Sequence, residues 1–126
     1  MRISVLAVFT CLCSVALAAD TIPQFIDIFP PQGEHTHGSS IIQCPDGSFL
    51  ACWFQGSGER SANDVRILGA RLKKGASRWS PVFLMADTPE LPDCNPVLYL
   101  DAKERVWLFW IAVRANRWEY SLLKYR

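Results

Sequence analysis

The sequence predicts an all-β protein made of β-propeller blades. Its apolar runs are short, rich in β-branched and aromatic residues, and broken by turn residues roughly every 8 to 12 positions, which is typical of strands. One stretch also recurs, because residues 39–54 (SSIIQCPDGSFLACWF) return as residues 95–110 (NPVLYLDAKERVWLFW), an offset of 95 − 39 = 56. A unit of four strands that recurs at roughly 40 to 55 residues indicates a propeller blade. The alternative is a small β-sandwich whose hairpins resemble one another.

The first blade is expected over residues 39–87. SSIIQC and SFLACWF flank the turn PDG, in which Gly47 can adopt a positive φ, so the two runs predict a β-hairpin. DVRILGARL and WSPVFLMAD follow as the third and fourth strands, separated by the turn KKGASR. Residues 19–38 contain several prolines and glycines and suit an extended lead-in without a helix.

The second blade is expected over residues 88–126, and it is incomplete. NPVLYL and RVWLFWIAV form its hairpin around the turn DAKE, and RWEYSLLKYR is its third strand. A propeller usually needs four to eight blades to close. We therefore expect the chain to be the N-terminal part of a longer protein; assembly with other chains is the alternative, and the sequence leaves the oligomeric state open.

Residues 1–18 have the pattern of a secretory signal peptide. Arg2 precedes an apolar run over residues 3–15, and Ala16 and Ala18 have the spacing of a cleavage site, with cleavage expected after Ala18. A retained anchor is the weaker alternative, because the apolar run is shorter than the ~20 residues needed to cross a bilayer. The pattern predicts a secreted or periplasmic protein that has no membrane span after cleavage.

The charge of the mature chain is balanced. Removing the signal leaves 126 − 18 = 108 residues with 13 − 1 = 12 basic and 12 acidic side chains, so the chain is formally neutral and nothing in its charge points to nucleic acid or an anionic membrane surface as partner. Three cysteines remain, Cys44, Cys52 and Cys94. Export permits a disulfide, but we favour buried apolar side chains, since three is an odd number.

Two stretches resemble a known family. HGSSIIQCPDGSFLACWFQGSGERSANDVRILGARLKKGASRWSPV and DCNPVLYLDAKERVWLFW are similar to the N-terminal blades of secreted bacterial proteins of the sialidase superfamily, which carry BNR (Asp-box) repeats on a six-bladed propeller. KKGASRW resembles a degenerate Asp-box that keeps Gly75 and Trp79, so Trp79 is expected to be part of the scaffold.

The resemblance implies part of an exported sialidase-like glycoside hydrolase that acts on a carbohydrate or glycoconjugate and needs no cofactor. Enzymes of this superfamily use a tyrosine nucleophile activated by a glutamate. Both would lie in later blades, so residues 1–126 alone are expected to be inactive. The alternative is a non-catalytic glycan-binding or scaffolding propeller. That alternative is favoured by His37, which stands where the family has the first arginine that binds the sugar carboxylate.

The resemblance also implies a catalytic role for Asp64. This residue lies in GERSANDVRI, in the loop that leads to the first blade's third strand, where the family has its acid/base aspartate. A carboxyl group at such a position can protonate a leaving oxygen if partial burial raises its pKa. The alternative is an aspartate that only caps a turn.

Five further residues are candidates for substrate binding. His37 is expected to hydrogen-bond the sugar, and Glu59 and Arg60 share the loop of Asp64. In the aligned repeat, Asp93 and Asn95 occupy the places of His37 and Ser39, so they are expected to face the same cleft.

No metal site is expected from the sequence. His35 and His37 would lie on one face of a strand with Glu34 nearby, but no third or fourth ligand follows at a suitable spacing.

Overall fold

The computed structural model describes residues 25–126 as seven antiparallel strands, without a helix in that range. The predicted signal peptide and the first part of the lead-in lie outside the described residues. The strands are β1 (His35–Gln43), β2 (Phe49–Gly56), β3 (Arg66–Leu72), β4 (Phe83–Ala86), β5 (Asp93–Leu100), β6 (Val106–Arg114) and β7 (Arg117–Tyr125). The predicted all-β class is confirmed.

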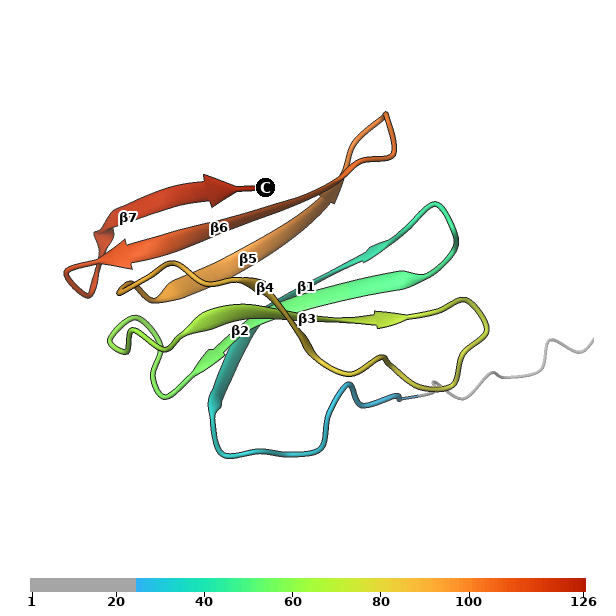
Figure 1. Ribbon diagram of the computed structural model, residues 1–126, viewed down its shortest axis with the longest axis horizontal. Helices are drawn as coiled ribbons and strands as arrows, with labels where there is room; N and C mark the ends of the chain where they lie inside the picture. The colour runs from blue at the N-terminus through green and yellow to red at the C-terminus, as the bar shows by residue number, and fades with distance from the viewer. Residues whose placement is uncertain (1–24) are drawn as a thin grey trace, which may run out of the picture.

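The strands form two sheets that pack against each other (Figure 1). The first has the order β1-β2-β3-β4 and the second the order β5-β6-β7. β1 and β5 lie side by side where the sheets meet, and the backbone N–H of Leu98 on β5 donates a hydrogen bond to the Oγ of Ser40 on β1 at 3.0 Å. β1 begins at His35, inside the stretch expected to be the lead-in, because the strand continues through a β-bulge between His37 and Ser40.

The two hairpins repeat at an offset of 57 residues, so the offset of 56 read from the sequence is wrong by one. Gln43 pairs with Phe49, and Leu100 pairs with Val106, which gives 100 − 43 = 57 and 106 − 49 = 57. The bulges between His37 and Ser40 and between Cys94 and Val97 follow the same offset. Since side chains alternate along a strand, the shift of one residue moves each predicted equivalent to the opposite face.

The main core fills the space between the sheets. Leu50, Cys52 and Phe54 of β2 point toward the second sheet and are buried there with Leu108 and Trp110 of β6. Alternate side chains of β2 point the other way, and Trp53 is covered by Phe29 of the lead-in, whose ring centroid lies 5.1 Å away. Trp79 also packs into this second cluster, as its scaffold role predicts.

The cysteines Cys44, Cys52 and Cys94 are free and buried. The preferred interpretation of these residues as small core side chains is confirmed. Removal from water raises the pKa of the Cys52 and Cys94 thiols to about 12. The thiols are therefore protonated at neutral pH and act as apolar packing groups.

Candidate functional site

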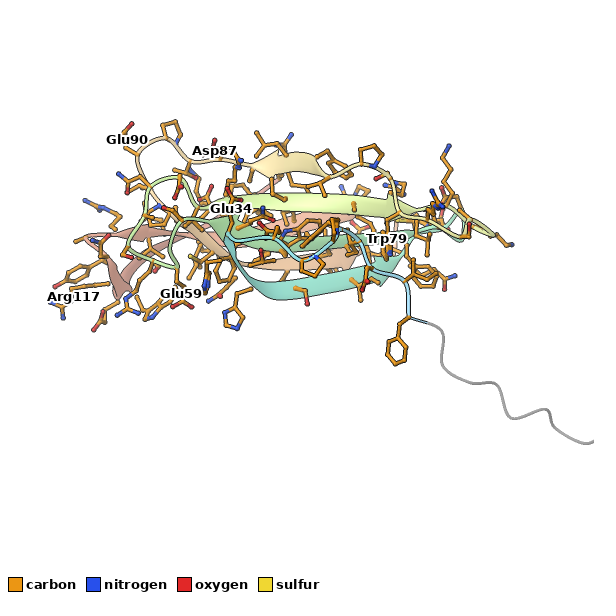
Figure 2. The ribbon with its side chains drawn as sticks, turned by 90° about the horizontal axis from the view of Figure 1, so that it is seen from below. Glu34, Glu59, Trp79, Asp87, Glu90 and Arg117 are labelled. Atoms are coloured by element: carbon orange, nitrogen blue, oxygen red, sulfur yellow. The ribbon has the colours of Figure 1, made fainter. Side chains whose placement is uncertain are left out.

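One end of the molecule gathers several predicted site residues. β1 and β5 begin there, β2 ends there, and the loop over residues 57–65 connects β2 to β3 at the same end. This loop is fixed to the second sheet, because the Asp93 backbone N–H donates to the Val65 carbonyl at 2.9 Å and the Cys94 thiol lies 3.7 Å from the Glu59 carbonyl. Figure 2 shows Glu59 at the same end as Arg117, with Trp79 toward the opposite end.

His37 and Glu59 are brought together at this end. His37 is exposed on β1, and its Nδ1 lies 3.7 Å from the Oε1 of Glu59. His35 lies two residues earlier on the same face, with its ring centroid 5.7 Å from that of His37 in an edge-to-face arrangement. The Phe54 ring lies behind both imidazoles at centroid distances of 5.9 and 5.6 Å. Two imidazoles and a carboxylate therefore share one small surface region.

Asn95 lies beside this group at the start of β5. Its backbone has a φ of 49° at the β5 bulge, and its side chain is exposed. The Asn95 Oδ1 lies 3.6 Å from the position that a Cβ would occupy on Gly38, the residue after His37. Gly38 has a φ of 60°, and an added Cβ would come within 2.7 Å of the Phe54 ring. The two bulges thus bring Asn95 and the β1 histidines to neighbouring positions.

Arg60 and Asp64 take part in holding their own loop. The Arg60 Nε donates to the Asn116 carbonyl at 3.0 Å, and the guanidinium lies 5.6 Å from the centroid of the Trp118 ring. The Asp64 carboxylate accepts hydrogen bonds from the Ser57 backbone N–H at 3.1 Å and from the Ser57 hydroxyl at 2.9 Å. The Asp64 contacts match the alternative of an aspartate that caps a turn, whereas the Arg60 contacts join the loop to the second sheet. The Asp64 side chain remains exposed.

Asp93 is fully buried, unlike the other candidates. Its carboxylate accepts from the Thr88 backbone N–H at 2.6 Å and from the Trp110 Nε1–H at 2.9 Å. Burial raises the pKa of Asp93, and the hydrogen bonds from Thr88 and Trp110 oppose this rise. In the corrected register His37 corresponds to Cys94, so the alignment that paired Asp93 with His37 was wrong. The buried Asp93 carboxylate therefore supports the fold by binding Thr88 and Trp110, and it is not exposed to a ligand.

A groove of about 500 Å³ next to His37 was not predicted. It lies between β1 and the lead-in, and its lining combines apolar and polar groups: Ile26, Asp27, Ile28, Phe29, Thr36, His37, Gly38, Ser39 and Trp53. The sequence places the lead-in before the first blade but does not show that it folds back over Trp53. The alternation of β2 puts Trp53 on the face opposite to Phe54, and this is the one signal in the sequence that could have indicated a cover on this side.

The strand order, the twofold hairpin repeat and the packing of one sheet against the next define the class of β-propeller blade proteins. Residues 47–126 match the family of BNR repeat-like domains, and the chain belongs to this family. Neither the curated proteins nor the solved structures contain a significant match to the chain. Among residues 25–126 there is no helix with the length and apolar character needed to cross a membrane.

Proposed function

We propose that the two blades form part of the carbohydrate-binding cleft of an exported sialidase-like glycoside hydrolase. The observation that supports this most directly is the grouping of His37, Glu59 and Asn95 at the shared end of β1 and β5. Imidazole, carboxylate and amide groups together both donate and accept hydrogen bonds, which suits the hydroxyl groups of a sugar. Membership of the BNR repeat-like family supports the same class of ligand, since such domains occur in sialidase-like glycosidases.

In this proposal the chain binds sugar but does not cleave it. The superfamily's tyrosine nucleophile is expected in later blades. Of this chain's tyrosines, Tyr99 and Tyr125 are on the outer face of the second sheet, and the Tyr120 ring centroid lies 5.0 Å from the Arg117 guanidinium. Asp64 retains its proposed acid/base role only in a protein that also supplies a nucleophile.

The second candidate function is a glycan-binding propeller without catalysis. The hydrogen bonds of Asp64 favour it, because this carboxylate is already bound to the backbone and hydroxyl of Ser57. The presence of His37 in place of the family's arginine also favours a ligand other than a sialic acid, since an arginine binds a carboxylate through two parallel hydrogen bonds and an imidazole does not.

Saturation-transfer NMR of the purified chain with neutral and acidic monosaccharides tests the binding proposal. His37→Ala and Asn95→Ala are each expected to weaken binding by roughly 2- to 10-fold, which corresponds to one hydrogen bond. Gln43→Ala is the matched control, because Gln43 is exposed at the other end of β1. Equal binding by the His37→Ala/Asn95→Ala double variant would refute the site. Turnover of an aryl glycoside by the chain itself would refute the claim that it only binds.

A further inference from the structure

We propose that His35, His37 and Glu59 form a binding site for a divalent transition-metal ion of the zinc type. One ligand atom from each of these three residues lies within 4.8 Å of the other two. The sequence showed the two histidines but no third ligand, because Glu59 is 59 − 37 = 22 residues away from His37. The fold supplies it through the loop over residues 57–65. This inference does not depend on the sugar-binding proposal.

The backbone arrangement favours chelation. His35 and His37 are separated by one residue on β1, so both imidazoles project from the same face. Glu59 approaches from the adjacent loop, whose backbone is held to the second sheet by the Cys94 thiol. The buried Phe54 ring lies behind both imidazoles and limits the directions in which they can turn. The metal would therefore link a strand to a loop that is already fixed in place.

The donor set selects the class of metal. Imidazole nitrogen suits zinc, copper, nickel and iron, whereas magnesium and calcium prefer oxygen ligands. Bonds of about 2.0 to 2.1 Å to zinc place tetrahedral ligand atoms roughly 3.4 Å apart. The His37 Nδ1 and Glu59 Oε1 are already 3.7 Å apart. A ring nitrogen of His35 lies within 4.8 Å of the other two ligand atoms, and rotation of this exposed side chain can bring it closer to both. Three protein ligands leave one coordination position open to water or to a ligand.

Neighbouring donor groups are already engaged. The Oε2 of Glu34 accepts a hydrogen bond from the Gln55 amide at 2.6 Å, which directs that carboxylate away from the cluster. The cysteines of the described residues are buried in the core. The expected set is thus two imidazoles and the carboxylate of Glu59, without a sulfur ligand.

Competition between the purified chain and a chromophoric chelator for Zn²⁺ tests the site, and Co²⁺ absorption reports its geometry. His37→Gln and Glu59→Gln are each expected to weaken Zn²⁺ binding by at least roughly 10- to 100-fold, since even residues that only support a ligand cost that much. Glu90→Gln is the matched control: Glu90 is an exposed carboxylate that lies away from the half-buried Glu59 (Figure 2), and the variant should bind like the wild type.

NMR of the wild-type chain makes the test independent of any folding defect in the variants. Zn²⁺ is expected to shift the ring signals of both histidines at one equivalent. Shifts of only one ring, or wild-type affinity in the His35→Ala/His37→Ala double variant, would overturn the proposal. Identical affinities of Glu59→Gln and Glu90→Gln would remove Glu59 from the site and overturn the three-ligand assignment.

Discussion

The two sheets have the same hairpin geometry but differ in how their corresponding faces are covered. At the offset of 57 residues, Leu50 and Cys52 of β2 correspond to Trp107 and Phe109 of β6. The β2 residues are buried under the second sheet, whereas the β6 residues are partly exposed. Around Trp107 and Phe109, the same outer face of the second sheet exposes Val97, Tyr99, Leu123 and Tyr125, each by more than half.

The kind of side chain on each face depends on whether another sheet covers that face. Where another sheet packs on the strand, a small Cys52 suffices because the neighbouring sheet fills the space. On the outer face of the second sheet the aromatic rings pack on one another: Trp107 and Phe109 stack with centroids 6.3 Å apart, and Tyr125 lies 6.0 to 6.2 Å from both. Such ring pairs stabilise the sheet by roughly 0.5 to 1.5 kcal/mol each beyond their burial.

The largest expected losses of stability come from replacing one phenylalanine on the buried face of the first sheet and one on the outer face of the second. Phe54→Ala is expected to lower the free energy of unfolding by about 3 to 5 kcal/mol, because the side chain is fully buried between the sheets. Phe109→Ala should cost roughly half as much or less, because its ring is partly exposed. Urea denaturation measures both. Equal losses would contradict the difference in coverage and show that the outer face of the second sheet is covered in solution.

The corresponding tryptophans give a second, smaller contrast. Trp53 and Trp110 correspond at the offset of 57, but Trp53 donates to the Gln55 amide oxygen and Trp110 donates to the buried Asp93. Asp93→Ala leaves the Trp110 indole and the Thr88 backbone N–H without acceptors, which should cost roughly 2 to 5 kcal/mol. Gln55→Ala should cost about 1 kcal/mol, because water can reach the partly exposed Gln55 position.

Thermal unfolding of the two variants under the same conditions measures this contrast. Asp93→Asn serves as the conservative control, because its amide oxygen can still accept one of the two hydrogen bonds. It should retain part of the lost stability. If Asp93→Ala and Gln55→Ala unfold at the same temperature, the two indoles are equally supported and the structural role of Asp93 is refuted.

Local patterns in the sequence were enough to predict the fold class and the strands. Short apolar runs and the turns PDG and DAKE predicted the two hairpins, and the structure confirms them. The exact repeat offset could not be obtained, because aromatic residues occupy adjacent positions in both copies. At an offset of 56, Trp110 therefore aligns with Phe54, although the residue that truly corresponds to Trp110 is Trp53. Only backbone pairing separates the two registers.

The candidate site was predictable only in part. Position in the repeat identified the end of the blades where His37 and Asn95 lie, but the contact between Glu59 and His37 depends on the path of a loop. The burial of Asp93 depends on Thr88 and Trp110, which lie in other segments of the second sheet and its connection. No local pattern records such tertiary contacts.

The hairpin turns provide the finest comparison of the two sheets, and we expect Glu104→Gly to stabilise the protein. Gly47 and Glu104 occupy the same turn position and have φ values of 77° and 59°. This left-handed conformation costs a residue with a Cβ about 1 kcal/mol relative to glycine. Glu104 is exposed and has no side-chain hydrogen bond among the described residues, so its replacement should raise the free energy of unfolding by about 0.5 to 1 kcal/mol.

The reverse change, Gly47→Ala, should destabilise by about 1 kcal/mol for the same reason. An added Cβ would also come within 2.9 Å of the Lys74 side chain, but that flexible chain can move aside. Urea denaturation of both variants, with Lys103→Ala as a control in the second turn, measures the pair. Because the backbone conformation is shared and only the residue differs, the two changes must have opposite signs. A loss of stability in Glu104→Gly would mean that the second turn does not hold the conformation of the first.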